Sequence, residues 1–136
     1  MGGVIEAEYI RLRTGEQYSH AVITSVDMTG KSIYTLGFID EQSQHFICHV
    51  DNLSLIYQPK HKRICQLNNE AVKKVKTADK QKYLQRLLEV NEGSVNPIFM
   101  KEIVQILQEI GEKAFRMSAT DWPVNSTSVL EKIKTA

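Results

Sequence analysis

Cysteine and histidine, placed side by side, could support covalent catalysis as a nucleophile and its base. Cys48 and His49 are adjacent, but neighbouring residues of a β-strand point to opposite faces, so they cannot form a nucleophile–base pair. We interpret Cys48 as a small core residue beside Phe46 and Val50. The sequence has no glycine-rich phosphate loop, no Gly-x-Ser-x-Gly elbow and no His-Glu-x-x-His motif. We therefore expect no enzymatic activity.

Possible zinc ligands also occur close together, at His45, Cys48, His49, His61 and Cys65. Structural zinc requires four convergent nitrogen or sulfur ligands. The first three of these residues alternate across a predicted strand, and the sequence has no Cys-x-x-Cys pair. We favour the interpretation of two exposed strand histidines and one histidine in a basic loop, and we expect neither a metal nor another cofactor.

A basic segment spans residues 58–86. It contains nine Lys and Arg residues and only two acidic residues, so its net charge is +7. Because the whole chain has a net charge of +1, the residues outside this segment have a net charge of −6. Such a local excess predicts contact with a phosphate backbone or an acidic partner; the alternative is a solvated helix face. The candidate ligand-binding or nucleic-acid-binding residues are Lys60, Lys62, Arg63, Lys73, Lys74 and Lys76, together with Tyr18.

Tyr18 joins this set because it follows a predicted turn, which makes it the best candidate for an exposed aromatic side chain. An exposed ring can stack on a base or contribute to a cage for a methylated side chain. Phe38 and Phe46 are assigned to the core from the alternation of their strands.

A strongly apolar helix face follows Asn96-Pro97. Packing within the chain is one interpretation, and docking of a protein partner is the alternative. The candidate partner-binding residues are Phe99, Ile103, Ile106, Ile110 and Trp122.

The elements that would position these residues divide the chain into two parts. Five short segments in the first part have strand periodicity: 4–13, 18–26, 32–39, 45–50 and 53–57. Turns at Gly15 and Gly30 join the first three, so we predict a small antiparallel barrel over residues 1–58.

We predict a helical region over residues 59–136. It begins with a basic connector, the residues between the barrel and the first helix. Asn68 or Asn69 can cap a helix over the basic segment, as one long helix or two short ones. Asn96-Pro97 is typical of a second helix start, and a short last helix is predicted at 126–133. The predicted fold class is therefore α+β, with a five-stranded barrel followed by helices.

The composition agrees with a globular chain of ordinary domain size. The 136 residues are 42% hydrophobic and 24% charged. Two cysteines imply no disulfide framework, and no apolar run approaches the ~20 residues of a membrane helix. The N-terminus does not have the pattern of a signal peptide. We expect an intracellular protein, cytoplasmic or nuclear, with no membrane association.

Three short motifs in the strand-rich part resemble Tudor domains: Tyr18–Asp27, then Gly30-Lys31, then Phe38-Ile39-Asp40. The spacing of Ala21, Ile23 and Asp27 is also similar to the first Sm motif. The resemblance covers residues 4–57 and implies a small, strongly bent, SH3-like barrel. Some Sm-like Gemin subunits of the SMN complex pair such a barrel with a helical part.

The ligand residues of both families are replaced in this chain. Glu41-Gln42-Ser43 stands where Tudor cages have Tyr-Gly-Asn, and the Arg-Gly of the second Sm motif is missing from 49–52. A barrel that has the fold of these families but not their ligand-binding residues suggests a protein-interaction module. We predict a non-enzymatic adaptor or assembly subunit in RNA-associated or ribonucleoprotein machinery, acting through a protein partner as a homo- or hetero-oligomer. The alternative is a direct binder of nucleic acid, RNA included, or of a small phosphorylated ligand, through residues 60–86.

Overall fold

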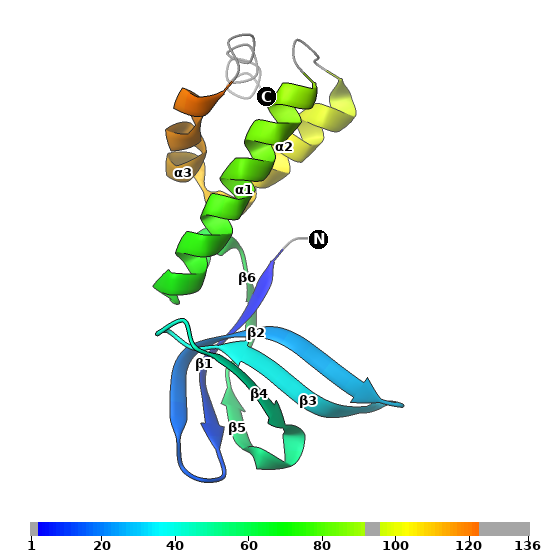
Figure 1. Ribbon diagram of the computed structural model, residues 1–136, viewed down its shortest axis with the longest axis vertical. Coiled ribbons are helices and arrows are strands. Elements are labelled where there is room, and N and C mark those ends of the chain that lie inside the picture. The colour runs from blue at the N-terminus through cyan, green and yellow to red at the C-terminus, as the bar shows by residue number, and fades with distance from the viewer. Residues whose placement is uncertain (1–2, 92–95, 123–136) are drawn as a thin grey trace. The chain divides into compact units, whose positions relative to one another are not determined.

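The computed structural model describes residues 3–91 and 96–122, and the chain forms two compact units, 1–75 and 76–136 (Figure 1). Residue 58, where the sequence predicts that the barrel ends, lies inside the first unit. The first unit continues to Val75 because the connector and the start of the first helix pack on the sheet. The predicted helix at 126–133 lies outside the described residues.

The first unit is built on a six-stranded antiparallel sheet. Its strands are β1 (Val4–Leu12), β2 (Gln17–Thr29), β3 (Ser32–Ile39), β4 (His45–His49), β5 (Leu53–Tyr57) and β6 (Lys60–Lys62). The order is β4-β3-β2-β1-β5, and β6 also pairs with β1. The prediction of an α+β chain with an antiparallel sheet followed by helices is confirmed.

Strand β6 is the part of the sheet that the sequence did not predict. It pairs with Val4, Ile5 and Glu6 at the start of β1, whereas β5 pairs with the end of β1. Lys60-His61-Lys62 is short and polar and carries no apolar alternation, so only pairing with β1 identifies it as a strand. The predicted count of five strands is therefore corrected to six.

The β2–β3 hairpin extends beyond the other strands as a two-stranded ribbon (Figure 1). β1 pairs with β2 only up to Ile23, and β4 pairs with β3 only from Thr35 onward. The ribbon carries large apolar side chains that are exposed: Val26, Met28, Ile33 and Tyr34.

Two apolar clusters stabilise the first unit. The larger lies on the inner face of the sheet and consists of Ala7, Ile10, Ala21, Leu36 and Phe38, with partly buried neighbours such as Phe46 and Cys48. The smaller contains Val22, Leu67 and Val72. Because Ala21 and Val22 are consecutive in β2, their side chains point to opposite faces. Leu67 and Val72 therefore cover the outer face of β2 from the connector and the first turn of α1.

The helices are α1 (Glu70–Val90), α2 (Pro97–Ile110) and α3 (Glu112–Met117), and short 3₁₀ turns lie at Val50–Asn52, Ile64–Gln66 and Ser118–Asp121. α1 is one continuous helix, which decides between the two alternatives for the basic segment. The predicted start at Asn96 is also found, with Asn96 Oδ1 accepting the N–H of Ile98 at 2.8 Å. Gly111, at φ 88°, ends α2 in a conformation that favours glycine. Within the described ranges, every helix is too short or too polar to cross a membrane.

Candidate binding surfaces

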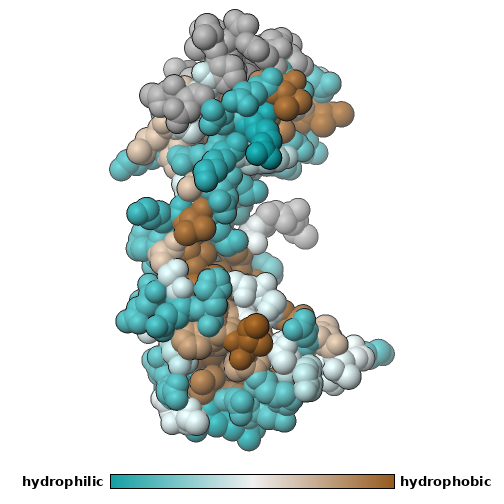
Figure 2. Space-filling view, in the orientation of Figure 1, coloured by the Kyte–Doolittle hydropathy of each residue, from teal (hydrophilic) through white to brown (hydrophobic). Residues whose placement is uncertain are grey.

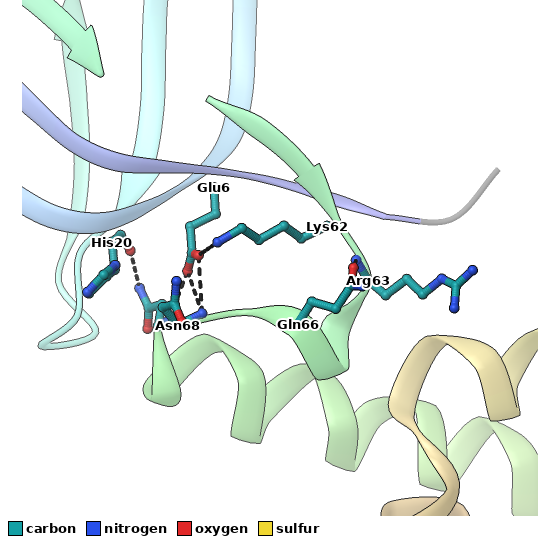
Figure 3. A network of polar contacts seen from close by, with 7 residues as sticks. Glu6, His20, Lys62, Arg63, Gln66 and Asn68 are labelled. Atoms are coloured by element: carbon teal, nitrogen blue, oxygen red, sulfur yellow. Dashed lines mark hydrogen bonds and ion pairs between the residues drawn. The ribbon is translucent and has the colours of Figure 1, made fainter. Parts of the chain in front are cut away.

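A buried carboxylate anchors the connector that carries the basic residues. Glu6 on β1 is 1% exposed, and Figure 3 shows its contacts. Its carboxylate accepts from Lys62 Nζ at 2.6 Å, from the N–H of Asn68 at 3.1 Å and from that of Asn69 at 2.8 Å. Burial alone would raise the pKa of Glu6, but the hydrogen bonds from Lys62 and the two backbone groups outweigh it and lower that pKa below its ordinary value.

Asn69 then fixes the start of α1 to the sheet. Its side-chain oxygen accepts the N–H of Val72 at 3.1 Å, which makes it the N-cap residue. Its amide donates to the carbonyl oxygens of His20 at 2.8 Å and Asp40 at 2.9 Å. His20 has a positive φ of 50°, which is uncommon for a residue other than glycine, so Asn69 binds the backbone at a strained point of β2.

The basic residues of the connector differ in what their side chains do. Lys60 and Arg63 are exposed, and in Figure 3 the Arg63 side chain points away from Glu6. The Lys62 side chain is only 21% exposed and its ammonium group is paired with Glu6. Lys62, which we predicted as a ligand-binding residue, therefore has a structural partner, and Lys60 and Arg63 are the accessible charges of the connector.

The lysines of α1 lie on two sides of the helix. Lys73, Lys76 and Lys80 share one side, as their spacing predicts, and all three are half-buried. The exposed basic residues of α1 are instead Lys74, Lys82 and Arg86. Of the three predicted residues on α1, Lys74 is thus the most accessible to a ligand.

Tyr18 differs from the exposed aromatic residue that we expected. It is half-buried, and its ring centroid lies 4.4 Å from that of Phe46 and 5.5 Å from that of Phe38. Its hydroxyl donates to Glu16 Oε2 at 2.6 Å, and this bond to a carboxylate raises the pKa of Tyr18. The three rings pack on one another at the core, so Tyr18 is a packing residue.

A different pair of tyrosines is stacked on the sheet. Tyr9 of β1 and Tyr57 of β5 are directly paired, with ring centroids 4.9 Å apart and planes inclined by 15°. The Arg11 guanidinium carbon lies 5.3 Å from the centroid of the Tyr9 ring, and Arg11 Nη2 donates to Gln17 Oε1 at 3.0 Å. None of these residues is among the binding residues predicted from the sequence. The only signal for them is the β1–β5 pairing implied by a small barrel, which does not give the register.

The predicted partner-binding residues of α2 are buried. Phe99 is 6% exposed, Ile103 0%, and Ile106 and Ile110 4% each. Trp122 packs on Phe115, with ring centroids 5.3 Å apart and planes inclined by 79°, and its Nε1 donates to Ser118 Oγ at 3.3 Å. A partner would have to separate packed side chains to reach this helix face.

Other apolar side chains do reach the surface, as brown areas on both units show in Figure 2. Among the described isoleucines, the most exposed are Ile47 of β4 at 78% and Ile98 of α2 at 75%. Met28 on the β2–β3 ribbon is 56% exposed. These residues, rather than the inner face of α2, are accessible to a partner.

The cysteine and histidine residues do not form a recognisable centre. No group of three His, Cys, Asp or Glu residues suited to a metal ion occurs in ranges 3–91 and 96–122. Cys48 packs against the core of the sheet, and burial raises the pKa of its thiol.

Comparison with known proteins yields no match to a protein-family model, to a curated protein or to a solved structure.

Proposed function

We propose that this chain is a non-enzymatic adaptor or assembly subunit that acts through protein contacts in RNA-associated machinery inside the cell. We further propose that its sheet is a small SH3-like barrel of the Tudor or Sm-like group. The order of the strands supports this second proposal, because β1 pairs with both β2 and β5, as the first strand of such a barrel does.

The edge strand β4 is the observation that carries the adaptor proposal. In the described sheet β4 pairs only with β3, so its other side presents backbone N–H and C=O groups to a partner strand. Natural edge strands are commonly protected by lysine, proline or other charges. β4 is His45-Phe46-Ile47-Cys48-His49, with no such residue and with Ile47 78% exposed.

The local packing explains why Ile47 is so exposed. Phe46 and Cys48 face the core, so the alternation of the strand directs Ile47 outward. Its cross-strand neighbour is Gly37, which has no side chain to shield it. A Cβ at Gly37 would collide with Ser25 Oγ, so no larger residue fits there without a shift of that side chain. An uncovered isoleucine on an unprotected edge favours an interface.

The test compares two isoleucines of nearly equal exposure, Ile47 and Ile98. The full chain and the variants Ile47→Lys and Ile98→Lys are used as bait, and stoichiometric partners are identified by cross-linking and mass spectrometry. We expect Ile47→Lys to lose a partner that wild type and Ile98→Lys retain, with cross-links near β4. Identical partners for all three baits, or no stoichiometric partner, would contradict the proposal.

Direct binding of nucleic acid through residues 60–86 is the second candidate. It is supported by the exposure of Lys60, Arg63, Lys74, Lys82 and Arg86. Each phosphate contact steepens the salt dependence of binding, so neutralising one lowers the slope by about 1. We expect Lys74→Gln, Lys82→Gln and Arg86→Gln together to weaken RNA binding and flatten its salt dependence. An unchanged slope would exclude α1 from the contact.

A further inference from the structure

The stacked tyrosines of β1 and β5 form an ordered row with Arg11. The Tyr9 ring contacts both groups: the Arg11 guanidinium carbon lies 5.3 Å from its centroid, and the Tyr57 centroid lies 4.9 Å from it. Gln17 Oε1 accepts from both Nε and Nη2 of Arg11, at 3.3 and 3.0 Å, and so holds the guanidinium in place. Neighbouring strands therefore fix the three groups before any ligand arrives.

Tyr57 is the open end of this row. Tyr9 covers one face of its ring, and β5 is the last strand on its side of the β4-β3-β2-β1-β5 path, so no further strand of that path covers the other. The Tyr57 residue is 38% exposed. The Gln58 amide approaches the Tyr57 hydroxyl at 3.5 Å, at the rim of the ring. A flat group stacked on Tyr57 would thus extend an existing stack without moving a side chain that the sheet packs.

The charges around the row select the class of ligand. A methylated lysine or arginine prefers aromatic rings without a competing cation, and here Arg11 already occupies the Tyr9 side of the stack. Lys60, which is exposed, follows Tyr57 by three residues, a chain distance of at most about 10 Å. A flat ring joined to a phosphate matches both features.

We propose that Tyr57 is a stacking platform for an unpaired nucleobase of a single-stranded nucleic acid, with Tyr9 and Arg11 holding its ring and Lys60 placed for the adjoining phosphate. The site lies on β1, β5 and β6, so it depends neither on β4 nor on α1. This proposal goes beyond the adaptor function. It also places direct nucleic-acid binding on the sheet and not on the basic helix α1.

The test measures fluorescence anisotropy of labelled ten-nucleotide single strands titrated with the full chain at low salt. Three strands are compared: RNA, DNA of the same sequence, and an abasic DNA with the same phosphates. Stacking predicts that the abasic strand binds more weakly than the normal DNA. The RNA and DNA arms identify which single strand is preferred.

The matched variants are Tyr57→Ala and Tyr57→Phe. Stacking of one base predicts that Tyr57→Ala weakens binding roughly 5- to 150-fold, whereas Tyr57→Phe stays within about twofold of wild type. Tyr57→Ala and wild type are expected to bind the abasic strand alike. Ile47→Lys is expected to bind all strands as wild type does, which separates this proposal from the adaptor function.

Three results would overturn the proposal: no saturable binding of any strand by wild type, equal affinity of wild type for normal and abasic DNA, or full affinity in a folded Tyr57→Ala. The comparison of normal with abasic DNA uses wild type alone. It therefore tests whether bases contribute to binding even if Tyr57→Ala does not fold.

Discussion

Glu6 and Lys62 are separated by 56 positions in the sequence, yet Lys62 Nζ lies 2.6 Å from Glu6 Oε1. The same carboxylate accepts two backbone N–H groups, those of Asn68 and Asn69, just before α1. One acidic side chain of the first strand thus binds both the connector, at Lys62, and the residues that precede α1, at Asn68 and Asn69. Removing one partner of a buried ion pair is strongly destabilising, because the other charge is left buried without compensation.

Glu6→Ala is expected to lower the free energy of unfolding of the full chain by about 2–4 kcal/mol, because it leaves Lys62 and two N–H groups without their acceptor. Urea unfolding followed by circular dichroism measures this change. Glu8→Ala is the control, since Glu8 is exposed on the same strand. A loss for Glu6→Ala no greater than that for Glu8→Ala would show that the network is not stabilising.

The stability of the first unit should depend on pH through Glu6. Because the folded state lowers the pKa of Glu6 from its ordinary 4.5, its contribution is fully present above the unfolded pKa. That contribution is lost as the pH falls through the lower, folded pKa. Urea unfolding of wild type and Glu6→Gln from neutral pH into the acid range should therefore give curves that converge below the ordinary pKa. A stability difference that does not shrink in acid would contradict this assignment.

Asn69 should matter more than an ordinary helix cap. Asn69→Ala removes the cap of α1 and the amide bonds to the carbonyl oxygens of His20 and Asp40, and we expect a cost of about 2–4 kcal/mol. Asn96→Ala removes an exposed cap of α2 and is expected to cost about 1 kcal/mol. Thermal unfolding of both variants gives the comparison. Equal losses would mean that Asn69 acts only as a cap.

Tyr18 is expected to behave as a core residue. Tyr18→Ala removes the ring that packs on Phe38 and Phe46 and should cost about 2–4 kcal/mol of unfolding free energy. Tyr18→Phe keeps the ring and loses only the exposed bond to Glu16, so its cost should be below about 1 kcal/mol. A Tyr18→Ala protein of wild-type stability with impaired ligand binding would instead support the original interpretation of Tyr18 as a binding residue.

Local patterns predicted much of the fold. Alternation located β1 to β5, and Asn96-Pro97 located the start of α2, because both signals lie within a few residues of the element they define. Strand β6 was missed because its existence depends on pairing with the start of β1. The sequence left open whether the basic segment forms one helix or two, and α1 runs through it without a break.

The candidate surfaces were harder to predict, because each depends on which residues the fold brings together. Basic composition identified the segment 58–86, but not that Lys62 is paired with Glu6. The apolar face of α2 was recognised, but the sequence does not tell packing within the chain from a free docking face. The Tyr9–Tyr57 stack requires the β1–β5 register, which no local motif specifies.

The adaptor function is tested most directly by backbone hydrogen exchange of the full chain, alone and in complex with the partner that Ile47→Lys loses. We expect the partner to slow exchange of the amides of β4, His45–His49, whose outer edge is unpaired within the described sheet. Protection confined to β5 or α1, with β4 exchanging as in the free protein, would contradict it.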